Sequence, residues 1–194
     1  MKATLDKGAN FWNAGWIYGP PNANSTQLLN YYFSIHPSDA QKVVLSIKGC
    51  CDMIDGPDCS PEGIRKNIDE ILKVLDGKVN IDMFEPARID PKVPVEDMMK
   101  TLADSVKDGK IGGIGLSEVN ASTIRRAHAV SPVSAVEVEM SLFSTDALTN
   151  GVFETCAELG IPVVAYSPLS RGWLTSSIQK FEDLPQSARH YPRF

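Results

Sequence analysis

The sequence has little positive charge, few histidines and no long apolar run. Its 194 residues carry 19 Lys and Arg against 24 Asp and Glu, a formal charge of −5, so a basic face for nucleic acid is not expected. Apolar stretches such as residues 161–166 are far shorter than the about 20 residues that cross a membrane. The first ten residues lack the hydrophobic core of a secretory signal. Because 43% of residues are apolar, the sequence predicts a globular protein without nucleic-acid or membrane partners.

Patterns for metal ligation and for nucleophilic catalysis are also missing. The cysteines at 50, 51, 59 and 156 form no C-x-x-C pair, and the three histidines lie far apart in the sequence. We therefore expect neither a zinc site nor a Ser-His-Asp triad. Reduced thiols and the missing signal sequence favour a cytoplasmic protein.

Short apolar runs alternate with segments of helical periodicity along the chain. Six runs predict β-strands, at residues 9–14, 43–48, 81–86, 113–117, 135–140 and 162–167. Four helices are predicted between them: one that opens at Ser60-Pro61 and ends before Gly77, one over 94–108, one capped by Asn120 or Ser122, and one over 147–159. Strands separated by one helix each predict an α/β fold with a parallel sheet.

Two architectures use this alternation, the open doubly wound sheet and the closed (β/α)₈ barrel. A dinucleotide-binding open sheet would show G-x-G-x-x-G after its first strand, whereas residues 112–115 (GGIG) open a strand instead. Polar residues at the carboxyl ends of successive strands favour the barrel. A barrel needs eight strands and about 250 residues. We therefore predict an incomplete barrel that forms a single, partial domain over residues 1–194.

Three strings of residues carry a resemblance to a known family. Residues 8–19 (GANFWNAGWIYG) look like G-x-N-x-x-D-T-A-x-x-Y-G, residues 109–117 (GKIGGIGLS) like G-K-I-R-x-I-G-V-S, and residues 163–172 (VVAYSPLSRG) like V-V-A-Y-S-P-L-x-x-G. In these strings, and in the strand over 43–48 that ends in a lysine, the chain resembles the aldo-keto reductases. The resemblance implies a TIM barrel of that family, of which this chain holds about strands two to seven.

A narrower resemblance concerns one branch of that family. Residues 12–15 (WNAG) and 86–90 (PARID) are most similar to the fungal pyridoxal reductases. The branch implies a small-molecule carbonyl substrate, an aldehyde such as pyridoxal, which is reduced to the alcohol.

The resemblance also implies the catalytic residues. Tyr18 matches the proton donor, and Lys48 matches the lysine whose positive charge helps the tyrosine to give up its proton. Asn13 stands where the family has the aspartate that pairs with the lysine, and it is expected to play an auxiliary role, since an amide carries no charge. The family's active-site histidine falls at Ala87, which has no polar side-chain atom.

The cofactor implied by the resemblance is NADP(H). Ser117, Glu118 and Glu137 match positions around the nicotinamide amide, and Tyr166 matches the aromatic residue that stacks on the ring. The stretch expected to wrap the pyrophosphate contributes Ser167, Leu169, Ser170 and Gly172.

Two other interpretations stay open. An inactive, truncated barrel that acts as a binding protein would explain the predicted gap in the barrel together with Asn13 and Ala87. Another barrel enzyme, such as a phosphate-binding isomerase, would leave the strings around Tyr18 and Lys48 unexplained. The sequence does not indicate an oligomeric state.

Overall fold

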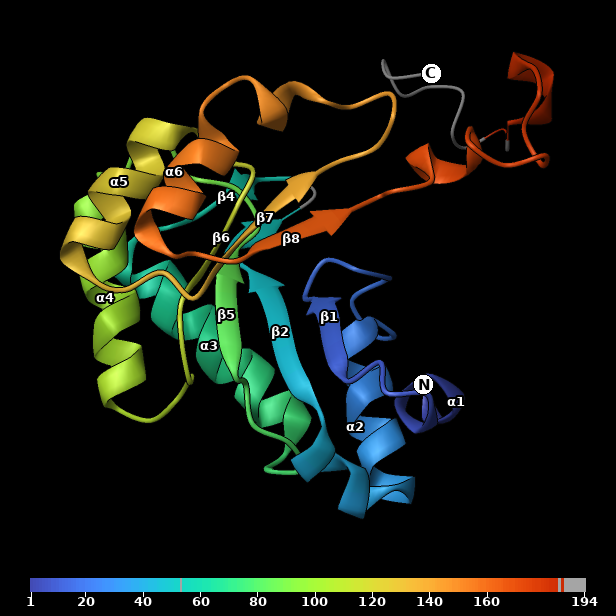
Figure 1. The fold of residues 1–194 in the computed structure, drawn as a ribbon. Helices are drawn as coiled ribbons and strands as arrows, with labels where there is room; N and C mark the ends of the chain where they lie inside the picture. Colours follow the sequence, from blue (N-terminus) through green and yellow to red (C-terminus); the bar gives the residue numbers. More distant parts are fainter. Residues whose placement is uncertain (53, 185, 187–194) are drawn as a thin grey trace.

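The computed structural model describes residues 1–52, 54–184 and 186, and strands alternate with helices along them (Figure 1). The strands are β1 (Phe11–Gly15), β2 (Val44–Gly49), β3 (Cys51–Asp52), β4 (Gly56–Pro57), β5 (Met83–Pro86), β6 (Gly115–Ser117), β7 (Ala135–Glu139) and β8 (Val163–Tyr166). The helices are α1 (Lys2–Asp6), α2 (Ser25–Ile35), α3 (Pro61–Leu75), α4 (Val95–Lys107), α5 (Ala121–Val130) and α6 (Val152–Leu159). Short 3₁₀ turns lie at Pro37–Lys42, Asp146–Leu148, Ser170–Gly172 and Phe181–Asp183. No helix in the described part of the chain is long and apolar enough to cross a bilayer.

Six of the strands form one curved parallel layer, and β3 and β4 form a separate antiparallel hairpin. Strands β1, β2 and β5 pair in that order, as do β6, β7 and β8. The two halves meet through a parallel bridge between Phe84 and Ile114, where the Phe84 amide donates to the Gly113 carbonyl at 3.1 Å. Within the described ranges no strand pairs with the outer edge of β1 or of β8. The predicted incomplete barrel, with all six predicted strands, is therefore confirmed.

The helices follow one another around the outside of this layer (Figure 1), and each contacts the next from α2 to α6. Apolar strand side chains that face the helices share one core with the inner faces of α3 and α4. These core residues include Leu45, Ile47, Phe84, Leu116, Val136, Ile64, Ile68, Ile71, Met98 and Leu102. Because burying one such side chain contributes about 1.5–3 kcal/mol, this interface is the main source of stability.

Local sequence signals explain where the helices begin and end. At α3 the Ser60 hydroxyl accepts from the Gly63 amide at 3.0 Å, and at α5 the Asn120 side chain accepts from the Thr123 amide at 2.8 Å. The Ser60 cap was predicted from the sequence, and Asn120 was one of the two residues predicted to cap α5.

Two helices differ from the sequence prediction. The last helix starts at Val152 instead of residue 147, because Gly151 has a φ of 84° and separates it from a 3₁₀ turn. Helix α2 was not singled out, although Asn24 and Gln27 form a complete capping box at its start.

Candidate active site

Polar side chains gather on the inner side of the strand layer, opposite the helices. Residues paired directly across parallel strands point to the same side of the sheet, and the register pairs Asn13 with Ser46 and Lys48 with Glu85. On the other half of the layer it pairs Ser117 with Glu137. The strand layer therefore places one amide, one ammonium and two carboxyl groups close together, near the carboxyl ends of the strands.

Lys48 is the centre of this cluster and is only 3% exposed. Its Nζ lies 3.2 Å from Glu85 Oε1, forms an ion pair with Glu137 Oε1 and donates to Asn13 Oδ1 at 3.3 Å. The Asn13 amide nitrogen donates in turn to both carboxyl groups, to Glu85 Oε1 and to Glu137 Oε2. Asn13 thus links the two acidic side chains that flank the ammonium.

The surroundings shift the proton affinities of these groups. Burial alone would lower the pKa of Lys48, but Glu85 and Glu137 outweigh burial and raise that pKa. Burial raises the pKa of Glu85 to about 7, against the opposing effect of Lys48 and with a further increase from Glu137. Glu85 Oε1 also accepts from the Ser46 hydroxyl at 3.3 Å, whereas Oε2 has no hydrogen-bond partner in the described part of the chain.

Tyr18 lies in the turn after β1 and is 45% exposed. The Nζ atom of Lys48 lies 6.0 Å from the centroid of the Tyr18 ring. Both residues line a cavity of about 320 Å³, together with Ile17, Cys51, Ala87, Arg88, Ser117, Glu137, Tyr166 and Arg171. Tyr18 is therefore accessible to a small molecule in the cavity, and its ring lies near a buried cation.

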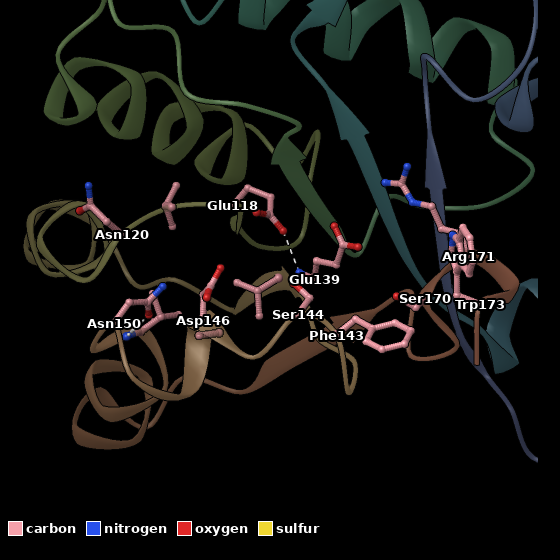
Figure 2. Close-up of a pocket in the computed structure, with 14 residues that line it drawn as sticks. Glu118, Asn120, Glu139, Phe143, Ser144, Asp146, Asn150, Ser170, Arg171 and Trp173 are labelled. Atoms are coloured by element: carbon pink, nitrogen blue, oxygen red, sulfur yellow. Dashed lines mark hydrogen bonds between the residues drawn. The ribbon is translucent and has the colours of Figure 1, made fainter. Parts of the chain in front are cut away.

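The opposite wall of the cavity is formed by the ends of β6 and β8. Ser117 is buried, and its Oγ has no hydrogen-bond partner among the described residues. Glu118 lies outside the cavity: its carboxylate accepts from the Glu139 amide at 2.7 Å (Figure 2). Burial and a hydrogen bond to Glu118 raise the pKa of Tyr166 to about 12, so its hydroxyl stays protonated. Tyr166 therefore presents a neutral aromatic ring to the cavity.

A larger hollow of about 860 Å³ lies beside the cavity, and Arg171 lines both (Figure 2). Ser170 and Trp173 border it on one side, and Asp146 and Asn150 border it on the other. The backbone at Ser167, Ser170 and Arg171 has positive φ values of 50–57°, so the segment after β8 curls tightly along this hollow.

Comparisons with known proteins agree with this architecture. The model of the Aldo/keto reductase family matches residues 1–192. The chain belongs to the aldo/keto reductase family.

Individual aldo/keto reductase relatives support a narrower comparison. The chain is 44% identical over 195 residues to "Probable pyridoxal reductase 2" of Schizosaccharomyces pombe, covering 99% of this chain and 58% of that protein. It is 37% identical over 185 residues to "Putative pyridoxal reductase" of Saccharomyces cerevisiae, covering 91% of this chain and 53% of that protein. The chain thus spans little more than half the length of these relatives.

A solved structure supports the fold itself. The glycerol dehydrogenase from Gluconobacter oxydans superposes with a TM-score of 0.85 at 22% identity, covering 100% of this chain and 60% of that one. At this identity the likeness concerns the barrel architecture alone.

The structure brings together most of the aldo/keto reductase residues predicted from the sequence. Those that line the cavity or its lysine cluster are Tyr18, Lys48, Asn13, Ser117, Glu137 and Tyr166. Glu118 and Ser170 line the larger hollow, and Leu169 is 57% exposed in the 167–172 segment. Their roles in catalysis and cofactor binding stay predictions.

Three charged residues of the site were missed by the sequence analysis: Glu85, Arg88 and Arg171. An acidic residue within an otherwise apolar strand was the available signal for Glu85. The two arginines lie in loops after β5 and β8, where nothing in their sequence neighbourhood indicates the direction of the side chain.

The residues present fit the nicotinamide end of a dinucleotide. Ser117 Oγ is a buried hydroxyl without a partner among the residues that the structure describes, the kind of group that a carboxamide satisfies. The Tyr166 ring offers a flat apolar surface, and the cavity has room for a ring of that size beside Tyr18. Glu137 is less suited to the carboxamide than expected, because Lys48 and Asn13 already engage its carboxylate.

Proposed function

We propose that this chain carries the catalytic residues of an NADPH-dependent reductase that converts an aldehyde, such as pyridoxal, to its alcohol. The observation that supports this proposal best is the pairing of an accessible tyrosine, Tyr18, with a buried ammonium, Lys48, at the wall of a small cavity. The names of the two yeast relatives support pyridoxal as the first substrate to test.

In this proposal Tyr18 is the proton donor. A carbonyl oxygen in the cavity gains negative charge as the carbonyl carbon is reduced, and a phenol within hydrogen-bond reach neutralises that charge by giving up its proton. Lys48, whose Nζ lies 6.0 Å from the centroid of the Tyr18 ring, is the cation that we expect to act beside this proton donor. The reduced nicotinamide supplies the hydride when it is bound, and Ser117 and Tyr166 are the residues that we expect to hold its ring.

The test is a comparison of Tyr18→Phe with Tyr31→Phe, measured by oxidation of NADPH in the presence of pyridoxal. Tyr31 is 66% exposed on α2 and does not line the cavity, so it is the matched control. We expect turnover in the unchanged chain and in the control, and a loss of about a hundredfold or more in Tyr18→Phe. Equal turnover in the two variants would refute the proton-donor role.

The second candidate is a protein that binds the nucleotide without catalysing the reaction. It is favoured by the outer edges of β1 and β8, which have no strand partner within the described residues, so that the strand layer is not closed into a barrel there. A thermal melt with excess NADPH separates the candidates: a raised midpoint without pyridoxal turnover supports binding alone, whereas turnover excludes it.

A further inference from the structure

The charges around Lys48 do not balance if every group is ionised. One ammonium faces two carboxyl groups, Glu85 and Glu137, so the cluster would carry a net charge of −1 in a place where all three side chains are at most 4% exposed. An uncompensated buried charge costs several kcal/mol, and the usual response of a carboxyl group is to keep its proton. One of the two acids is therefore expected to be neutral.

The hydrogen bonds indicate which acid keeps the proton. Glu137 has both oxygens engaged, Oε1 by Lys48 and Oε2 by the Asn13 amide, as a carboxylate requires. Glu85 receives all its contacts on Oε1, and its Oε2 has no partner among the described residues. A charged oxygen left bare in the interior costs more than a neutral hydroxyl group left without a partner, so the bare Oε2 is tolerated better in the protonated acid than in the carboxylate.

The neighbouring strand makes room for Glu85. A Cβ atom on Gly115 would lie 3.0 Å from Glu85 Cβ and 3.2 Å from Glu85 Oε2, so a side chain at this position would press against Glu85. Glu85 is thus enclosed by β6 on one side and by the lysine cluster on the other.

We propose that Glu137 is the positioning residue that holds the Lys48 ammonium, and that Glu85 lies beside the pair as a neutral carboxylic acid linked to it through Asn13. The charge that compensates Lys48 therefore comes from Glu137 on β7 and not from position 13, where the amide carries no charge. The raised pKa of Glu85 agrees with this assignment. An aspartate at position 13 would add a third carboxylate and remove the one amide that donates to both acids.

The kinetic part of this inference rests on the proposed function, but its central claim can be measured without turnover. The measurement is the pKa of Lys48, followed by NMR of the chain labelled at the lysine ε-carbon. We expect Glu137→Gln to lower that pKa, and we expect the double variant Asn13→Asp/Glu137→Gln to restore it, since the double variant returns one carboxylate to the ammonium from β1. Glu154→Gln removes an exposed carboxylate on α6 and is the matched control.

If the pKa of Lys48 is the same in Glu137→Gln as in the control, or stays low in the double variant, the proposal is wrong. A titration of the glutamate carboxyl carbons gives a second measurement on the unchanged chain. One glutamate that stays protonated at pH 5.5 and disappears from the spectrum of Glu85→Gln supports the neutral acid. Full ionisation of every glutamate at that pH refutes it.

Kinetics separate this role from cofactor binding. A positioning role predicts that Glu137→Gln lowers kcat about tenfold or more while KM for NADPH stays within about twofold, and that the double variant regains kcat. A raised KM with an unchanged Lys48 pKa would instead assign Glu137 to the nicotinamide amide and overturn the proposal. If the unchanged chain shows no turnover, the proposed function fails, and the NMR titrations still decide the positions of charge and proton.

Discussion

Replacement of Glu85 by glutamine should change how the stability of the protein depends on pH. Glu85 is fully buried, and its pKa is raised from an ordinary value of 4.5 to about 7. Between these two values the folded state holds a proton that the unfolded state has lost, so the stability due to this group decreases as the pH rises. Glutamine stays neutral throughout, and the variant should not show this decrease.

The size of the effect follows from the two pKa values. The difference between 4.5 and about 7 corresponds to about 3 kcal/mol in the free energy of unfolding. This contribution is fully present below pH 4.5 and lost above pH 7. Relative to the unchanged chain, Glu85→Gln should therefore gain about 3 kcal/mol between pH 4 and pH 8, most of it between pH 5 and pH 7.

The assay is urea unfolding at 25 °C, followed by circular dichroism at a series of pH values between 4 and 8. Only the difference between variant and unchanged chain is interpreted, because other carboxyl groups add pH dependences common to both. Glu154→Gln, on the exposed face of α6, should show a difference that stays constant with pH. A constant difference for Glu85→Gln as well would show that Glu85 is ionised in the fold, and the reasoning on the cluster would fail.

Substitutions at three further positions test the packing of the fold and one helix cap. Gly115→Ala places a Cβ 3.0 Å from Glu85 Cβ, so it should lower the free energy of unfolding by about 1–3 kcal/mol in urea titrations. An unchanged unfolding midpoint would mean that Glu85 can shift away from this contact without a cost in stability. Ile68→Ala, at a fully buried position of α3, should cost about 2–5 kcal/mol in the same assay, and a cost below 1 kcal/mol would contradict the helix–sheet core. Asn120→Ala removes the hydrogen bond from the Thr123 amide and should lower the free energy of unfolding by about 1 kcal/mol, whereas Asn120→Ser should retain most of the stability. Equal losses of stability in the two variants would show that this hydrogen bond does not stabilise the helix.

Much of the fold could be predicted because the strands and the later helices carry strong local signals. The run 81–86 and the periodic helix that ends before Gly77 leave few alternatives once glycine and proline mark their ends. Helix α2 was harder to detect, since its sequence STQLLNYYFSI combines apolar and polar residues without a clear face, and Leu28 and Tyr31 on it are exposed. The start of α6 depended on the conformation of a single glycine, Gly151.

Only those site residues that lie within family motifs could be predicted from the sequence. Tyr18, Lys48 and Tyr166 come from strings that a family shares, whereas the partnership between Lys48 and Glu85 is a property of strand register. Register is set by the packing of the whole layer, and a shift of one residue would turn Glu85 toward the helices. The sequence therefore contained the acidic residue but not its position relative to the lysine.

The junction between β5 and β6 has a consequence for the dynamics of the protein. Asn13, Lys48 and Glu85 lie on the half formed by β1, β2 and β5, whereas Ser117 and Glu137 lie on the half formed by β6, β7 and β8. Over the described ranges the halves share one bridge and few backbone hydrogen bonds, such as those from the amides of residues 84 and 112. A local opening there would part Lys48 from Glu137 while both halves stay folded. Hydrogen exchange at these two amides should therefore report on the lifetime of the assembled site rather than on global unfolding.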